Sequence, residues 1–134
     1  MRTIRKGAEP QSLTQHRCNS HADFENYANK DDLRASLVRE QRGLCCYCLS
    51  RIHPSSASMK IAHWHSQNLH PAEQLDYGNL LGACRGGEGS PFEQQYCDTR
   101  QRNLDISKNP ANPIHGVESY VRFEGDGRIC STDP

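Results

Sequence analysis

The segment that decides the fold is LCCYC, residues 44–48. Within it, Cys45 and Cys48 have the C-x-x-C spacing of a zinc knuckle, in which one tight turn directs two thiolates at a single ion. Two ligands leave a tetrahedral site incomplete, and Cys84 and Cys97 are the natural completing pair. The residues that allow the loop between them to fold back are Gly86, Gly87 and Gly89. We therefore predict a structural zinc ion held by four thiolates.

The remaining cysteines fit the site less well. Cys46 could replace a neighbouring ligand, because it lies inside the same short segment. Cys18 and Cys130 are distant from the others in sequence, and we expect buried or free thiols there. The other common use of C-x-x-C, a thioredoxin-like redox pair, requires a βαβ surround that this sequence does not indicate.

Composition favours a domain stabilised by metal. The 134 residues fit one domain, and a hydrophobic fraction of 34% with a mean hydropathy of −0.86 is low for a chain held by core burial alone. A structural zinc site can add on the order of 10 kcal/mol of folding free energy. With no apolar N-terminal segment and no run long enough to span a membrane, we expect a reduced, cytoplasmic protein, in which clustered cysteines are usually metal ligands.

The charges give a weaker indication. The 16 basic and 16 acidic residues cancel, which argues against a broad phosphate-binding surface. Basic residues still gather locally, in the ranges 34–60 and 100–108. We therefore expect local basic patches on a neutral protein.

The chain divides into an N-terminal arm, residues 1–21, and a zinc-bound domain, residues 22–134. The arm is expected to be irregular and to contact a partner. Residues 31–43 are expected to form a helix, because Asp31 can cap its start and Gly43 suits the position just after its end.

Strands and a second helix are expected further along. Residues 59–64 and 120–123 favour strands, and the second of these leads into a glycine turn at 125–127. Ser90 begins a capping-box pattern with proline at the next position, so we expect a helix that carries residues 97–98. Together these elements predict a small α+β fold.

Between the two cysteine pairs lies KIAHWH, residues 60–65, and Asn79 follows His63 by sixteen positions. The order of C-x-x-C, apolar-x-His, Asn-Leu-Leu, Cys and Cys-Asp resembles the HNH nucleases of the ββα-metal class. More narrowly, the chain is similar to the HNH subunit of Septu-type and retron-associated anti-phage systems. The segments that carry this resemblance are KGAEP (6–10), Leu13-Thr14, CCYC (45–48), His63-Trp64 and YCD (96–98).

The resemblance implies a zinc-stapled ββα-metal fold and roles for three residues. His63 would be the general base that takes a proton from water, and an unperturbed histidine pKa of about 6.5 suits that role. Asn79 matches the central Asn of the motif, whose amide braces the loop and orients the base. Asp98 matches its final position and would be a ligand for Mg²⁺ or Mn²⁺, which neutralises charge during phosphodiester hydrolysis.

The resemblance also implies substrates and partners. The chain would be the endonuclease of an anti-phage defence complex and would cleave DNA or RNA, with tRNA among the candidates. Its partners would be an ABC-type ATPase and, in retron-associated systems, a reverse transcriptase with its RNA–DNA product. A net charge near zero agrees with a nuclease that needs partners to deliver its substrate.

The sequence departs from the family just before His63. That position is usually acidic, or another metal ligand, whereas here it is Ala62, and a methyl group cannot coordinate a cation. Three explanations are open: a deliberate inactivating substitution, a naturally silenced copy, or a site that recruits His65 instead. We favour the first, because the rest of the site is kept. The chain as written is then expected to cleave slowly or not at all.

A non-catalytic zinc-ribbon adaptor, which recruits a partner protein or nucleic acid, is the alternative interpretation. It explains the cysteines equally well, but it does not explain why His63 and Asn79 stand at the HNH positions. A zinc deaminase is excluded, because the required H-x-E is missing at His63 and no P-C-x-x-C follows.

Overall fold

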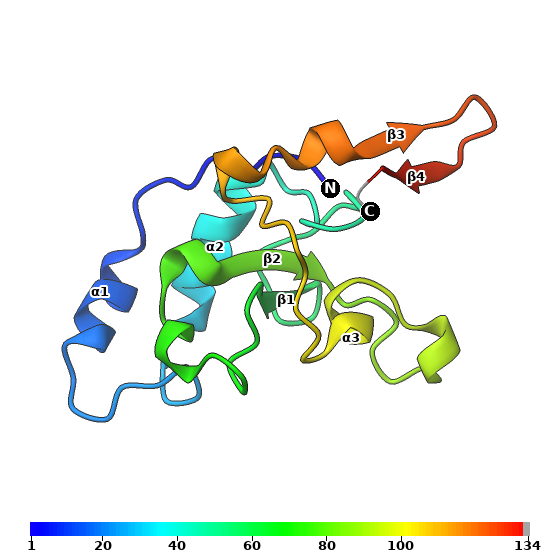
Figure 1. Ribbon diagram of the computed structural model, residues 1–134. Coiled ribbons are helices and arrows are strands. Elements are labelled where there is room, and N and C mark those ends of the chain that lie inside the picture. Colours follow the sequence, from blue (N-terminus) through cyan, green and yellow to red (C-terminus); the bar gives the residue numbers. More distant parts are fainter. Residues whose placement is uncertain (133–134) are drawn as a thin grey trace.

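The computed structural model describes residues 1–132 of a small mixed α/β fold (Figure 1). Its helices and strands are α1 (Gln11–Arg17), α2 (Lys30–Glu40), β1 (Met59–His63), β2 (Leu80–Cys84), α3 (Cys97–Gln101), β3 (Val121–Phe123) and β4 (Ile129–Ser131). Single 3-10 turns lie at Pro71–Glu73, Tyr77–Asn79, Phe92–Gln94, Pro113–His115 and Val117–Tyr120. No helix within residues 1–132 has the length and apolar character needed to cross a membrane.

An antiparallel hairpin of β1 and β2 forms the centre of the fold (Figure 1). Met59 pairs with Cys84 at one end and His63 with Leu80 at the other. The strand expected at 59–64 is confirmed and ends one residue earlier. Every residue of β2 is buried, since α2 and α3 both pack against it. Pairing with the buried strand β2 therefore fixes the positions of Met59 and His63 at the two ends of β1.

The apolar core consists of two clusters. The one between α1, α2 and the hairpin has the buried members Leu13, Phe24, Tyr27, Leu33, Leu37, Leu75, Tyr77 and Leu80. The other, the cysteine cluster, has the buried members Ile4, Cys45, Cys46, Ile52, Met59, Ala62, Leu81, Ala83 and Cys84. Leu80 and Leu81 belong to different clusters because successive side chains of a strand point to opposite faces.

Helix α2 confirms the helix expected at 31–43 but not its caps. No side chain caps its first turn, so the expected Asp31 cap is wrong. Asp31 lies inside that turn, where a negative charge is favourable to the helix dipole. At the other end the N–H of Gly43 donates to the carbonyl of Val38 (2.8 Å). Arg42, with a φ of 56°, occupies the C′ position expected for Gly43, which follows it with a φ of 72°.

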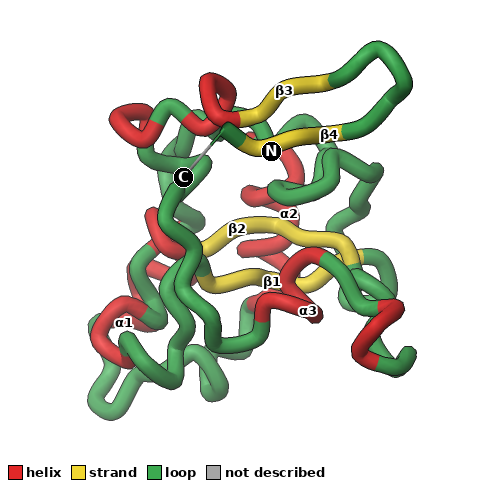
Figure 2. The backbone as a smooth tube through the Cα atoms, turned by 45° about the vertical axis from the view of Figure 1, so that its right-hand side comes forward, coloured by secondary structure: helices red, strands yellow, loops and turns green. Residues whose placement is uncertain are grey.

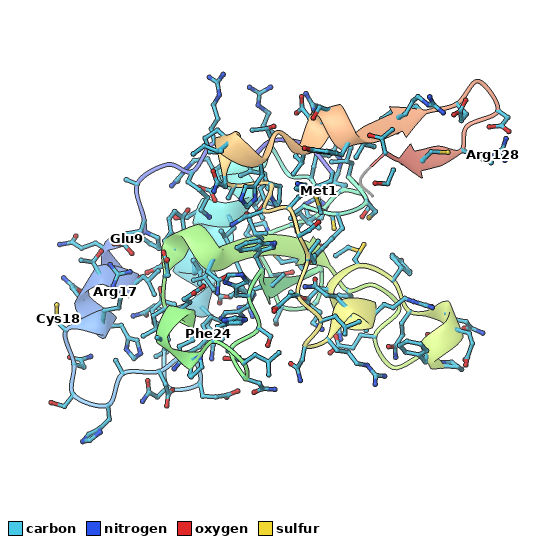
Figure 3. The ribbon with its side chains drawn as sticks, in the orientation of Figure 1. Met1, Glu9, Arg17, Cys18, Phe24 and Arg128 are labelled. Carbon is cyan, nitrogen blue, oxygen red and sulfur yellow. The ribbon has the colours of Figure 1, made fainter. Side chains whose placement is uncertain are left out.

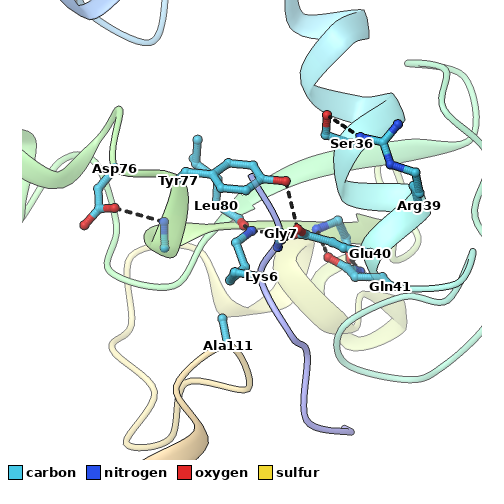
Figure 4. A network of polar contacts seen from close by, with 12 residues as sticks. Lys6, Gly7, Ser36, Arg39, Glu40, Gln41, Asp76, Tyr77, Leu80 and Ala111 are labelled. Carbon is cyan, nitrogen blue, oxygen red and sulfur yellow. Dashed lines mark hydrogen bonds and ion pairs between the residues drawn. The ribbon is translucent and has the colours of Figure 1, made fainter. Parts of the chain in front are cut away.

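The N-terminal arm, residues 1–21, is not irregular as expected, because it contains α1. Leu13 of this helix is wholly buried. Ahead of the helix, Lys6 enters a polar network in which its Nζ contacts Glu40 (2.6 Å) and the carbonyl of Leu80 (2.8 Å) (Figure 4). Burial lowers the pKa of Lys6, while the Glu40 carboxylate opposes this effect. Apolar and ionic contacts thus fasten the arm to α2 and β2.

The continuous helix expected over 90–98 is wrong. One turn at Phe92–Gln94 is followed by extended backbone at Gln95 and Tyr96, so α3 begins only at Cys97. The N–H of Tyr96 donates to a carbonyl of the preceding glycine loop. A continuous helix could not make this contact, because its N–H groups would be directed along the helix axis.

The C-terminal strand expected at 120–123 is confirmed as β3. A second strand, β4, pairs with it antiparallel across the glycine turn at 125–127. Figure 2 shows this hairpin above the β1–β2 hairpin, and Arg128 lies toward its outer end in Figure 3.

Candidate metal centre and histidine site

Four cysteine thiols meet in one group. The sulfur atoms of Cys45 and Cys97 lie 4.0 Å apart, and those of Cys48 and Cys84 lie 3.8 Å apart. All four lie within 4.8 Å of one another. A tetrahedral zinc ion with Zn–S bonds of about 2.3 Å separates its sulfur ligands by about 3.8 Å. The group can therefore hold a structural metal such as zinc, and its members are the four cysteines that the sequence predicts.

Three parts of the fold supply these thiols. Cys45 and Cys48 lie in the turn after α2, Cys84 ends β2, and Cys97 begins α3. The backbone N–H of Cys84 donates to the sulfur of Cys45 (3.2 Å), a contact that stabilises thiolate ligands. An ion bound here would tie α2, the hairpin and α3 together.

The glycine loop brings Cys97 back to the site. Gly86 has a φ of 57°, and a Cβ placed on it would overlap with the carbonyl oxygen of Tyr96. Gly87 has a φ of 71°, and a Cβ there would lie 2.8 Å from the carbonyl oxygen of Gln94. The N–H of Tyr96 donates to the carbonyl of Gly86 (3.0 Å). Glycine is required at both positions, which confirms the folding back expected of this loop.

The four thiols do not ionise independently. Hydrogen bonds with Cys46 and Cys97 lower the pKa of Cys45. The hydrogen bond with Cys45 raises the pKa of Cys97, and burial raises the pKa of Cys84. Ionisation of Cys45 is thus favoured, while Cys84 and Cys97 are held in the protonated form. A divalent cation would be needed for all four to ionise together.

The other three cysteines lie outside the group. Cys46 is buried, and its N–H donates to the carbonyl of Gly82 (2.9 Å). Burial raises the pKa of its thiol. Cys18 is exposed and Cys130 is half-buried. All seven cysteines carry free thiols.

His63, the predicted base, ends β1 and is 9% exposed. Its Nε2 lies 3.1 Å from the carbonyl oxygen of Gln74 and must donate to it, which leaves Nδ1 as the unprotonated nitrogen of the neutral ring. The ring makes an edge contact with Phe24, at 4.6 Å between centroids. Burial lowers the pKa of His63, while the Gln74 hydrogen bond and the charge of Asp98 oppose this. The ring is therefore neutral at neutral pH.

Asn79 holds the loop that follows His63, and it is 3% exposed. Its Oδ1 accepts from the N–H of His65 (2.7 Å), and its Nδ2 donates to the carbonyls of His65 (3.0 Å) and Glu73 (3.1 Å). Its own carbonyl accepts from the N–H of Trp64 (3.0 Å). Asn79 thus fixes the backbone directly after the predicted base, although it does not bond the His63 ring.

Asp98, the predicted ligand for Mg²⁺ or Mn²⁺, lies in the first turn of α3. Its Oδ2 is 3.3 Å from Nζ of Lys60. Burial raises the pKa of Asp98, and the charges of Lys60 and His63 oppose this rise. Asp98 and His63 are close enough for their charges to interact, but no hydrogen bond or ion pair joins them within residues 1–132. Ala62, on the same strand face as Lys60, is 1% exposed in the cysteine cluster.

His65, the alternative ligand, lies beside two other potential ligands. Its Nδ1 is 2.7 Å from Oε2 of Glu73. Its ring stacks on Trp64 and on His70, with centroids 4.0 Å and 4.2 Å away. Sequence reasoning missed Glu73, because only the turn at Pro71–Glu73 brings it back to His65. The only feature of the sequence that indicated this group was the presence of two histidines five positions apart, His65 and His70.

The structure brings the predicted residues together to different degrees. The four cysteines form one group, and His63 and Asn79 lie at the two ends of the connection between β1 and β2, while Asp98 is paired with Lys60. No protein-family model matches the chain, and no curated protein is significantly similar to it. Its function must therefore be inferred from its residues and their geometry.

Proposed function

We propose that the chain is a metal-dependent endonuclease of the HNH type, in which β1, β2 and α3 form the ββα-metal unit. The observation that carries this proposal is the environment of His63. A backbone carbonyl fixes Nε2 of the buried ring, and Nδ1 has no hydrogen-bond partner within residues 1–132. A neutral imidazole held in this way is prepared to accept a proton.

The chemistry assigns separate tasks to the neighbouring groups. Nδ1 of His63 would take the proton of a water molecule as its oxygen attacks the phosphorus atom. The carbonyl of Gln74 would keep the ring in the required tautomer, and desolvation would keep it unprotonated. Bound Mg²⁺ or Mn²⁺ would neutralise charge on the phosphate and the leaving oxygen. Asp98 is the carboxylate that would hold this ion, in exchange for its contact with Lys60.

Ala62 limits this activity. In the proposed unit it stands where a second metal ligand would be expected, and its methyl group offers no oxygen. Mg²⁺ requires nearly ideal octahedral coordination, so Asp98, waters and substrate phosphate alone would position it poorly. The proposal therefore includes slow or absent cleavage by the chain as written, and restored cleavage when residue 62 is acidic.

The proposed substrate is DNA or RNA, with tRNA among the candidates. Arg2, Arg5 and Arg42 line a cavity of about 490 Å³ that Glu40 and Glu118 also line, and His63 and Asp98 do not. None of the three arginines is paired with a carboxylate in the part of the chain that the structure describes. Unpaired guanidinium groups are suited to phosphate oxygens. The proposed setting is an anti-phage complex with an ABC-type ATPase and, in retron-associated systems, a reverse transcriptase with its RNA–DNA product.

A non-catalytic zinc-ribbon adaptor is the second candidate. The contact between Lys60 and Asp98 favours it, because this contact occupies the carboxylate that the cation would need. The adaptor would use the cysteine group to hold its shape and would recruit a partner protein or nucleic acid without cutting it.

The test is cleavage by the chain purified together with its co-expressed ATPase partner. DNA, RNA and tRNA are incubated with Mg²⁺ or Mn²⁺, and the unaltered chain is compared with the Ala62→Glu variant. We expect metal-dependent cleavage by the variant and little by the unaltered chain. Equal cleavage by both would show that Ala62 does not mark a missing ligand. No cleavage by either, in an intact complex, would favour the adaptor.

A further inference from the structure

We propose a second metal site, formed by His65, His70 and Glu73. The potential ligand atoms of these three residues all lie within 4.8 Å of one another. Two imidazoles and a carboxylate form a ligand set that binds zinc and leaves a fourth position open to water. Imidazole nitrogen suits Zn²⁺ or Co²⁺ and does not suit Mg²⁺, which prefers oxygen. This inference concerns metal binding alone and does not depend on the proposed nuclease activity.

One compact turn of the chain supplies all three ligands. His65 follows the end of β1, while His70 directly precedes the 3-10 turn at Pro71–Glu73 and Glu73 ends it. The N–H of His70 donates to the carbonyl of Ser66 (2.8 Å), and the N–H of Glu73 donates to the carbonyl of His70 (3.0 Å). These backbone hydrogen bonds fold the chain back, so that His65 lies beside His70 and Glu73.

A buried amide holds both ends of this turn. Asn79 accepts from the N–H of His65 and donates to the carbonyls of His65 and Glu73. Because Asn79 is 3% exposed, these bonds do not compete with bulk water. The backbone positions of the first and last ligands are therefore set by the fold before any ion binds, which lowers the entropy cost of binding.

The side chains already interact with one another and remain accessible. Nδ1 of His65 lies 2.7 Å from the Glu73 carboxylate, and Nε2 of His70 lies 3.3 Å from Asp105. The side chains of His65, His70 and Glu73 are 27%, 31% and 43% exposed, so an ion from solvent can reach them. Stacked rings do not direct their nitrogens at one point, so one imidazole must turn when the ion replaces the contact between His65 and Glu73.

The site carries its own optical reporter. Trp64 is the sole tryptophan of the chain, and its ring stacks on His65 with centroids 4.0 Å apart. Paramagnetic Co²⁺ bound at His65 should quench the fluorescence of Trp64. Trp64 also packs against the cysteine cluster, but Co²⁺ that replaced zinc there would in addition produce the strong sulfur-to-cobalt absorption of thiolate ligands, and this absorption tells the two sites apart.

The experiment is a Co²⁺ titration of the zinc-loaded full chain, followed by Trp64 fluorescence. We expect saturable quenching with one ion per chain, unchanged by excess Mg²⁺ and without thiolate absorption. Glu73→Gln and His70→Ala should each weaken binding by about tenfold or more. His53→Ala, at an exposed histidine outside the turn, is the matched control and should bind as the unaltered chain does.

Two results would overturn the proposal. One is quenching that does not saturate. The other is equal affinity in the unaltered chain, Glu73→Gln and His70→Ala. Melting temperature and zinc content of each variant show that it is folded, and Glu73→Gln, which keeps the size of the side chain, decides the matter if His70→Ala is unstable.

Discussion

Replacing Cys84 and Cys97 with serine is expected to unfold much of the domain. These two thiols connect β2 and α3 to the knuckle in the turn after α2. A structural zinc site contributes on the order of 10 kcal/mol, and whole domains are typically stable by about 5–15 kcal/mol. Small residues, cysteine and alanine, make up much of the surrounding cluster, so little apolar area is available to offset the loss of the ion.

Elemental analysis and thermal unfolding followed by circular dichroism measure this effect. The unaltered chain is expected to hold one zinc ion at the cysteine group and to unfold cooperatively. The variant with Cys84→Ser and Cys97→Ser should lose both properties. A variant with Cys18→Ser and Cys130→Ser is the matched control, since those thiols lie outside the group. Full zinc content and an unchanged melting temperature after loss of Cys84 and Cys97 would refute the four-thiolate site.

Three further predictions concern the glycine loop at the cysteine group, the ion pair that fastens the N-terminal arm, and the amide of Asn79. Gly86→Ala should weaken zinc binding in a chelator competition, because the new methyl group would overlap with the carbonyl of Tyr96; unchanged affinity would contradict the loop geometry. Glu40→Gln should lower the free energy of unfolding in urea by about 3–5 kcal/mol, because it leaves the Lys6 charge buried and unpaired. A loss below about 1 kcal/mol would mean that this pair behaves like a surface contact. Asn79→Ala should slow cleavage by the active complex less than loss of the base does, and an equal loss in the same assay would give Asn79 a direct part in the chemistry.

The cysteine group and strand β1 could be predicted from the residue types and their spacing in the sequence. The sequence predicts the four-sulfur group correctly. A tetrahedral metal site needs four ligands, and the C-x-x-C pair of Cys45 and Cys48 is completed by Cys84 and Cys97 around the glycine loop. The composition of 59–64 likewise predicts β1, whereas its partner β2 was not predicted as a strand.

Elements that depend on distant contacts were not predictable in the same way. The capping-box pattern at Ser90 favours a helix locally. The hydrogen bond from the N–H of Tyr96 to Gly86 requires extended backbone instead, and the structure has this bond and not the continuous helix. Helix α1 has no side-chain cap and is stabilised by the burial of Leu13 against residues far along the chain. Glu73 joins the histidines because of the turn at Pro71–Glu73, which Asn79, just before β2, holds by a hydrogen bond to the Glu73 carbonyl.

Cleavage by the proposed complex that carries Ala62→Glu, with and without His63→Ala, is the most direct test of the proposed nuclease function. A general base contributes about 10²–10⁴-fold to the rate, so His63→Ala should slow cleavage at least about a hundredfold at equal protein and zinc content. His63→Gln, which better fills the space beside Phe24, should be equally slow and separates chemistry from packing. Cleavage at the parent rate by either variant would contradict the assignment of His63 as the base.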